Sequence, residues 1–201
     1  MPHVNVNDLQ LFYEEEGAGV PVLMAHGGFS DISEWQHQAA PLASRYRAIR
    51  YDRRGCGRST PRDVEHTAEW WVEDQRELIN ALGLDRPVIA GVSYGGMLLI
   101  EFLIRYPDMG RAAIIVSGTA RGVHGRVPFP DRTGDLGGIT TPTLVVQGTQ
   151  DDHFPPEHGE QIARSLTNAR LVVLDGGHTI NNQRIQEFND AALAFLDEVL
   201  G

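Results

Sequence analysis

Hydrophobic residues fall into two patterns that alternate along most of this chain. Near the N-terminus, residues 4–6 and 9–15 alternate between apolar and polar around a turn at Asn7-Asp8, which predicts an antiparallel hairpin. Further on, short and nearly continuous apolar runs predict buried strands at residues 22–25, 47–51, 88–90, 112–116, 143–146 and 171–174. Between them, helical periodicity predicts helices at residues 35–43, 67–82, 97–103, 157–166 and 184–200.

The order of these elements predicts an α/β fold. Apolar strands that alternate with helices indicate a mostly parallel twisted sheet of about eight strands with helices on both faces. The length suits a single domain, residues 1–201, in which only residues 120–138, rich in Gly, Pro and Arg, lack periodicity and predict an irregular surface connection. Thr67 is the expected N-cap of the helix at 67–82, and Gly83 is its expected C-cap.

The amino-acid composition narrows the kinds of binding partner and the cellular location that are expected for this protein. The chain carries 17 basic and 27 acidic residues, a formal net charge of −10, which argues against nucleic acid and anionic membranes as partners. No run approaches the ~18 apolar residues of a membrane span, and the first residues do not resemble a signal peptide. Cys56 is the single cysteine, so a reducing, cytoplasmic location is expected, with a secreted form that has lost its signal as the alternative.

The most informative motif is the segment Gly91-Val92-Ser93-Tyr94-Gly95-Gly96. It joins the apolar run at 87–90 to the helical run at 97–103, and strand, G-x-S-x-G, helix is the arrangement of a nucleophile elbow. In so sharp a turn, a side chain on either glycine would collide with neighbouring backbone. The turn leaves the Ser93 hydroxyl at its tip, near helix N–H groups that stabilise negative charge. An ordinary glycine-rich turn between strand and helix is the alternative.

A serine hydroxyl needs a base within hydrogen-bond reach, and the base needs an orienting carboxylate. His178 follows the strand at 171–174 through Asp175-Gly176-Gly177, and Asp151 and Asp152 follow the strand at 143–146. Because active sites of parallel sheets lie at the carboxyl ends of the strands, these side chains are expected to meet Ser93 at one edge.

The segment His26-Gly27-Gly28-Phe29 directly follows the strand at 22–25. A loop at this position supplies one backbone N–H of an oxyanion hole, and Tyr94, the residue after the nucleophile, supplies the other. Gly28 and Phe29 are the candidate donors in the loop, with Phe29 slightly favoured. His26 is expected to brace the loop by hydrogen bonding rather than to act as the base.

Five motifs in this order resemble those of the α/β-hydrolase superfamily, in its branch of small esterases, lactonases and perhydrolases. They are the oxyanion loop at 26–28, the D-x-R-G-x-G-x-S turn at 51–59, the elbow at 91–96, the acid loop at 148–151 with Pro155, and the histidine loop at 176–178. The resemblance covers almost the whole chain and implies the α/β-hydrolase fold. Since relatives place the acid three residues after the glycine, it also implies a catalytic triad of Ser93, Asp151 and His178, with Asp151 favoured over Asp152.

The resemblance also separates this chain from other chemistries. Haloalkane dehalogenases and epoxide hydrolases carry a carboxylate at the elbow, whereas Ser93 implies acyl transfer. Ser117 stands where some members carry the acid after the sixth strand, and Cys56 has no assigned base. No metal and no cofactor are expected, because His153 and His158 are interpreted as exposed loop histidines and no group has metal-ligand spacing.

The chain departs from the family between the sixth and seventh strands. Typical members insert a helical cap of many tens of residues there, but residues 120–138 are too few for one, so the cap is expected to be nearly absent. Ser93 should then lie in a shallow, open groove with broad specificity. The groove candidates, each of which could equally belong to the core, are Phe29, Tyr94, Met97, Phe129 and Phe154. Apolar residues left uncovered would favour a homo-oligomer.

These observations predict a carboxylic ester hydrolase that acts through an acyl-enzyme on small soluble esters. The first alternative is a lactonase or perhydrolase with the same triad. The second is a ligand-binding regulatory protein on a hydrolase scaffold, although such relatives depend on a closed pocket. Proline iminopeptidases and carbon–carbon bond hydrolases are disfavoured, because they use cap residues to bind their substrates.

Overall fold

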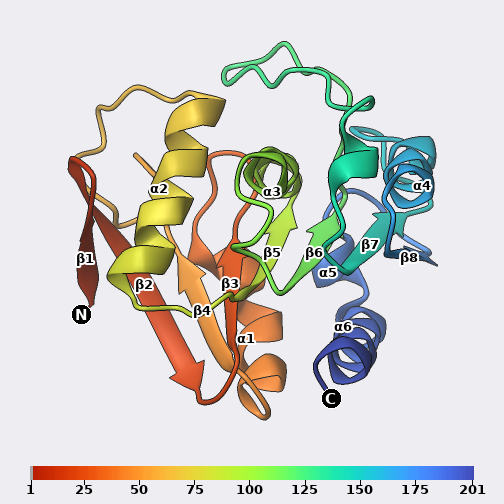
Figure 1. The fold of residues 1–201 in the computed structure, drawn as a ribbon, viewed down its shortest axis with the longest axis horizontal. Coiled ribbons are helices and arrows are strands. Elements are labelled where there is room, and N and C mark those ends of the chain that lie inside the picture. Colours follow the sequence, from red (N-terminus) through yellow and green to blue (C-terminus); the bar gives the residue numbers. More distant parts are fainter. Residues whose placement is uncertain (1) are drawn as a thin grey trace.

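Eight strands form one twisted sheet in the order β1-β2-β4-β3-β5-β6-β7-β8 in the computed structural model, which describes residues 2–201 (Figure 1). Their bounds are β1 (His3–Val6), β2 (Leu9–Gly17), β3 (Pro21–Ala25), β4 (Arg47–Tyr51), β5 (Val88–Val92), β6 (Ala112–Val116), β7 (Thr143–Gly148) and β8 (Ala169–Leu174). β2 pairs antiparallel with β1 and β4, and all other neighbours are parallel. The prediction of a mostly parallel, eight-stranded sheet is therefore confirmed.

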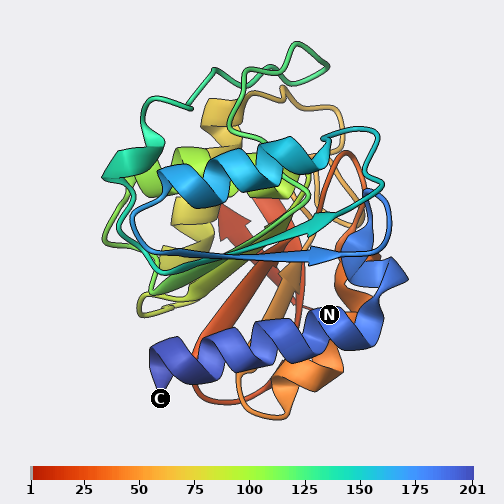
Figure 2. The same cartoon turned by 90° about the vertical axis from the view of Figure 1, so that its right-hand side faces the viewer.

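Helices cover both faces of this sheet (Figure 2). α2 (Ala68–Ala81), α3 (Tyr94–Arg105) and α4 (Pro156–Ser165) lie on one face, and α1 (Gln36–Ala43) and α6 (Ile185–Leu200) lie on the other. Three short elements complete the chain: η1 (Ile32–Trp35), η2 (Leu136–Gly138) and α5 (Ile180–Gln183). Within residues 2–201, no helix combines the length and the hydrophobicity needed to cross a bilayer.

Each face of the sheet has its own apolar core, because successive side chains of a strand point to opposite faces. On β5, Ile89 packs in the cluster beneath α2 and α3, whereas Val88 packs in the cluster beneath α1 and α6. Trp71 and Trp35 are the largest buried side chains of the two clusters, at 2% and 1% exposure. The central strands are thus buried on both sides, which gives the loops at their carboxyl ends a rigid base.

The structure contains both predicted caps of α2, whereas α3 and α5 differ from the helices predicted from the sequence. The Thr67 side chain accepts a hydrogen bond from Trp70 N at 3.0 Å, and Gly83 follows the helix with φ +61°. α3 begins at Tyr94, three residues earlier than its apolar run, because the two glycines of the elbow are already helical. α5 was not expected, since four residues are too few to show a helical period.

The connection between β6 and β7 contains residues 120–138, and it forms a loop above α2 and α3 (Figure 1). Val123 and Phe129 pair through two backbone hydrogen bonds of 3.0 Å, and η2 is the one helical turn in this stretch. Val127 and Leu136 are fully buried. In the part of the chain that the structure describes, no multi-helix cap stands over the carboxyl edge of the sheet.

Candidate active site

Ser93 lies in the tight turn between β5 and α3, with φ 54° and ψ −116°. A positive φ is costly for a residue with a side chain, and the surrounding contacts must hold it. A Cβ on Gly91 would lie 2.8 Å from Gly96 N, and closer still to the Gly95 carbonyl. A Cβ on Gly95 would lie 2.9 Å from the His26 carbonyl oxygen. Both glycines are therefore required for the turn, as the sequence predicts.

The loop after β8 brings His178 to Ser93. His178 Nε2 lies 2.8 Å from Ser93 Oγ, and the two residues are 85 positions apart in the chain. Gln150 N donates to Gly176 O at 2.7 Å, and Gly177 N donates to the Gln183 side chain at 2.6 Å, so the histidine loop is fixed to the acid loop and to α5. The imidazole thus reaches the serine at hydrogen-bond distance from a braced loop.

Asp151 lies on the other side of the same imidazole. Its Oδ1 and Oδ2 are 3.0 Å and 2.9 Å from His178 Nδ1, and the residue is 4% exposed. Oδ1 also accepts from His153 N and Phe154 N, and Oδ2 accepts from Gln147 Nε2 at 3.0 Å. Three donors besides the imidazole therefore fix the carboxylate. Gln147 was missed by sequence reasoning, although a polar residue at the end of a buried strand is a usable signal.

Asp152 points away from this cluster, with a side chain that is 88% exposed. Its Oδ1 lies 2.9 Å from Nδ1 of His153, whose ring stacks on that of His178 with centroids 4.5 Å apart and planes at 21°. His153 is exposed as expected, yet it also lines the cavity at Ser93. His158 is half-buried rather than exposed, because Nδ1 lies 2.7 Å from Thr119 Oγ1, and burial lowers its pKa.

Asp151, His153 and His178 each offer one ligand atom within 4.8 Å of the others, the spacing of a possible metal site. Both ring nitrogens of His178 already have partners, since Nδ1 lies 2.9 Å from Asp151 Oδ2 and Nε2 lies 2.8 Å from Ser93 Oγ. Both oxygens of Asp151 already accept hydrogen bonds from protein donors. The arrangement therefore favours a base held by a carboxylate over a shared metal ion.

The oxyanion loop is held from below by buried groups. His26 is fully buried, its Nε2 accepts from Arg53 N at 3.0 Å, and its Nδ1 lies 3.0 Å from Gly27 O. Burial and the neighbouring Arg53 hold the pKa of His26 well below its usual range, so the ring is neutral. Arg53 also donates to Gly28 O. His26 thus contacts backbone on both sides, as expected of a bracing residue.

A cavity of about 300 Å³ opens at Ser93. Its lining residues are Gly27, Gly28, Ser30, Glu34, Ser93, Tyr94, His153 and His178. Gly28, with φ +42°, has open space around the position of a Cβ. Gly27 N donates to Glu34 Oε2 at 2.6 Å, which leaves Gly28 and Phe29 as the candidate donors of this loop. Glu34 was not identified from the sequence.

The predicted groove residues lie around this cavity rather than in its walls, with Tyr94 as the exception. Met97 and Phe129 are 2% and 4% exposed and line a separate space of about 10 Å³. Phe154 is half-buried, with its ring centroid 5.6 Å from that of His178. Phe29 is 37% exposed, and its ring contacts His66 at 5.0 Å between centroids.

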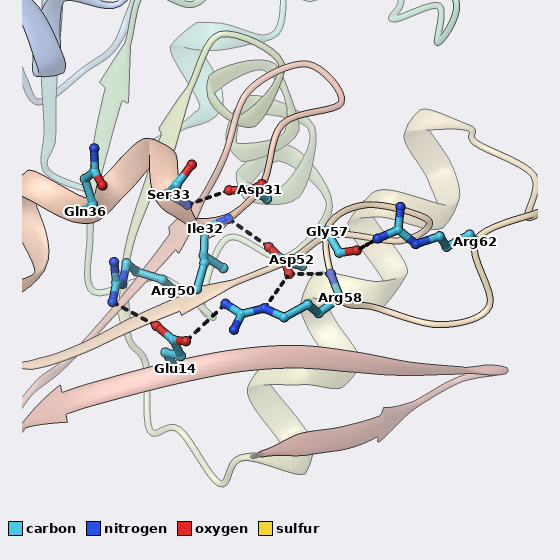
Figure 3. A pocket seen from close by; sticks show the side chains of 10 residues that line it. All are labelled: Glu14, Asp31, Ile32, Ser33, Gln36, Arg50, Asp52, Gly57, Arg58 and Arg62. Atoms are coloured by element: carbon cyan, nitrogen blue, oxygen red, sulfur yellow. Dashed lines mark hydrogen bonds and ion pairs between the residues drawn. The ribbon is translucent and has the colours of Figure 1, made fainter.

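A larger cavity of about 460 Å³ lies near the D-x-R-G-x-G-x-S turn (Figure 3). Its charged side chains bind each other: Glu14 pairs with Arg50 at 3.1 Å and with Arg58 at 3.0 Å. Asp52 accepts from Ile32 N and Arg58 N. Ser33 provides the one hydroxyl in this lining, and in the described residues it is the Ser33 backbone N–H rather than its hydroxyl that binds Asp31, so we interpret the turn as structural. Ser93, despite its smaller cavity, is the better candidate for chemistry.

Comparison with known proteins gives sequence relatives for most of the chain. A model of the alpha/beta hydrolase family matches residues 22–135, and a model described as TAP-like protein matches residues 117–198. The non-heme haloperoxidase of Rhodococcus erythropolis is 34% identical over 115 residues, which cover 56% of this chain and 42% of that protein. The chain spans less than half the length of the curated relatives that it matches.

Solved structures share the fold over nearly the full chain. A thermophilic esterase from Thermogutta terrifontis has a TM-score of 0.93 and 23% sequence identity, covering 100% of this chain and 99% of that one. The enol-lactonase from Burkholderia xenovorans LB400 has a TM-score of 0.91 and 23% identity, covering 98% of this chain and 100% of that one. At such identities, these likenesses concern the fold alone.

Proposed function

The chain belongs to the alpha/beta hydrolase family, and we propose that it is a serine hydrolase of small, soluble carboxylic esters. The proposal rests on one chain of hydrogen bonds. Ser93 Oγ lies 2.8 Å from His178 Nε2, and His178 Nδ1 lies 2.9–3.0 Å from the two carboxylate oxygens of Asp151. A serine is activated when a base accepts its proton and a carboxylate stabilises the resulting imidazolium.

In the proposed reaction, Ser93 Oγ attacks the ester carbonyl carbon while His178 Nε2 takes the hydroxyl proton. The tetrahedral oxyanion binds to Tyr94 N–H at the start of α3 and to a second N–H in the loop after β3. We place this second donor at Gly28, because Gly28 lines the cavity, and we keep Phe29 N–H as the alternative. His178 then gives its proton to the leaving alcohol, and water cleaves the acyl-enzyme by the same route in reverse.

The absence of a cap in residues 120–138 and the open cavity at Ser93 favour small substrates. Residues 120–138 contribute a loop but no cap, and the cavity at Ser93 is open to solvent on the side of His153. Few apolar walls remain to bind a long acyl chain, so specificity should be broad and acyl chains short.

A perhydrolase or lactonase is the second candidate, and particular observations favour it. One sequence relative is named a non-heme haloperoxidase, and one structural relative is an enol-lactonase. Both reactions can use the same nucleophile, with hydrogen peroxide or a cyclic ester as the partner. Turnover of γ-lactones, of aryl esters, and of halide in the presence of peroxide and acetate would distinguish the three activities.

The decisive experiment compares the wild-type chain with Ser93→Ala on 4-nitrophenyl acetate and butyrate. We expect the substitution to abolish both the burst and the steady-state release of nitrophenol, with an unchanged circular dichroism spectrum. Intact-mass spectrometry of the quenched wild-type reaction should reveal the acyl group on Ser93. Equal turnover by the two proteins would refute the proposal. Tight binding of a ligand with turnover slower than minutes would favour the regulatory alternative instead.

A further inference from the structure

Glu34 places a carboxylate in the wall of the Ser93 cavity, where neither the nucleophile nor the base requires one. Its Oε2 accepts a hydrogen bond from Gly27 N at 2.6 Å. The position that a Cβ on Gly27 would occupy is 3.1 Å from Ser93 Cβ and 3.4 Å from Glu34 Oε2. The carboxylate and the serine side chain therefore both lie close to Gly27 on the side where a Cβ would project.

The position of Glu34 is fixed by contacts from two parts of the chain. The backbone oxygen of Glu34 accepts from Asn181 Nδ2 at 3.1 Å and from Asn182 Nδ2 at 3.0 Å, and both asparagines belong to α5. Asp31 caps the preceding end of η1 by accepting from Ser33 N at 2.8 Å. Glu34 is thus a held element of the site rather than a mobile surface side chain.

The charge of Glu34 has no cationic side chain beside it in the cavity. The lining residues include neither arginine nor lysine, and Glu34 is the one carboxylate among them. Burial raises the pKa of Glu34, and the charge of Arg53, which lies outside the cavity lining, partly opposes that rise. Arg53 is 2% exposed, donates to Gly28 O and lies 4.0 Å over the Trp71 ring. Within residues 2–201, Glu34 Oε1 accepts no hydrogen bond, and it is not one of the fully buried polar atoms without a partner, so it keeps some contact with solvent.

We propose that Glu34 selects esters that carry a cationic nitrogen, a protonated amine or a quaternary ammonium group, within a few bonds of the scissile carbonyl. The inference rests on the proposed ester hydrolase function and names its substrate class. A cation about 5 Å from a carboxylate, at an effective dielectric constant of roughly 20–40, gains on the order of twenty- to three-hundredfold in kcat/KM over a neutral group of the same shape, before screening by salt. An anionic group at the same place is disfavoured.

The test uses two pairs of esters in which a quaternary nitrogen replaces a carbon. On the alcohol side, acetylcholine is compared with 3,3-dimethylbutyl acetate. On the acyl side, the 4-nitrophenyl ester of 4-(trimethylammonio)butanoate is compared with that of 5,5-dimethylhexanoate. Burial raises the pKa of Glu34, so assays at pH 8 keep the carboxylate ionised. The wild-type chain should prefer the cationic member of at least one pair by roughly tenfold, and 1 M NaCl should reduce this preference.

Glu34→Gln is the informative variant, because its amide oxygen still accepts from Gly27 N–H while its charge is lost. The preference should disappear in Glu34→Gln and persist in Glu187→Gln, which removes an exposed carboxylate of α6 and changes the net charge equally. An unchanged ratio in both pairs would show that Glu34 only braces the loop, and it would overturn the inference.

A binding measurement separates this inference from the proposed function. Calorimetric titration of Ser93→Ala with each of the two cationic esters should give, for at least one of them, an affinity about tenfold higher than that of Ser93→Ala/Glu34→Gln. Equal affinities for both esters would overturn cation recognition even if the wild-type chain hydrolyses esters. Absence of Ser93-dependent turnover, with unequal affinities, would overturn the hydrolase function and leave the cation site in place.

Discussion

Gly91→Ala tests whether the backbone turn at Ser93 depends on close approach between β5 and α3. The added Cβ would lie 2.8 Å from Gly96 N and closer to the Gly95 carbonyl, where ordinary contacts begin at 3.4 Å. These neighbours are backbone atoms of a buried helix end, so they cannot move aside as a flexible side chain would. Overpacking of this kind typically costs 1–3 kcal/mol, and backbone neighbours place Gly91 at the upper end, about 3 kcal/mol.

For a chain of this length, such a loss corresponds to a decrease of roughly 6–12 °C in Tm. Because relief of the contact must displace the turn by up to about 1 Å, kcat on 4-nitrophenyl acetate should fall by about a hundredfold. Urea unfolding measures the loss of stability, thermal unfolding the shift in Tm, and ester turnover the loss of activity. Gly134→Ala is the matched control, since a Cβ there meets nothing within 4 Å, and it should leave all three quantities nearly unchanged. A Gly91→Ala protein as stable and as active as the wild type would refute the reasoning.

Two further predictions concern the acid of the site and the response to pH. Asp151→Asn should lower kcat by about 10⁴-fold, because the asparagine cannot stabilise the imidazolium. Asp152→Asn removes an exposed carboxylate, so its kcat should stay within about twofold of the wild-type value. Similar losses of kcat in both variants would contradict the assignment of Asp151. Burial lowers the pKa of His26 well below 6.5, so the unfolded chain binds a proton that the folded chain excludes. His26 should therefore contribute about 1.4 kcal/mol per pH unit to the fall in the free energy of unfolding below about pH 6, and His66 and His158, whose pKa burial also lowers, add to the same fall. Urea titrations between pH 7 and pH 5 should give a shallower slope for His26→Asn than for the wild type, and equal slopes would contradict the contribution of His26.

Sequence reasoning was sufficient for the elements that carry their own local signal. Each predicted strand has its counterpart among β1–β8, because apolar runs bounded by turn residues are readable without tertiary context. Ser93, Asp151 and His178 each follow such a strand within a few residues, so their strands bring them to one edge of a parallel sheet. Their roles in catalysis remain predictions, to be tested by the variants above.

Contacts across the fold could not be read from the chain in the same way. Glu34 sits between the buried residues Ile32 and Trp35, in a turn too short to show periodicity, and its contact with Gly27 appears only in three dimensions. Gln147, near the end of the buried strand β7, stands out in the sequence as polar, but its hydrogen bonds to Asp151 Oδ2 and Phe154 O depend on how the acid loop folds back. Met97 and Phe129 were equally compatible with groove and core, and burial against Trp71 and Tyr94 places Phe129 beneath the site.

The hydrogen bonds between η1–α1 and α5–α6 have a consequence for when the protein becomes functional. Gln38 Nε2 donates to Asn181 O at 2.8 Å, Asn189 Nδ2 donates to His37 O at 3.1 Å, and these partners are 143 and 152 positions apart. Contacts between such distant segments require closure of a long loop, so we expect them to form late in folding. A growing polypeptide on the ribosome therefore lacks the hydrogen bonds that Glu34 O and Gln38 make with α5 until that segment has emerged. Under the proposed function, the return of ester turnover after dilution from urea should report the docking of α5 and α6 rather than the first collapse.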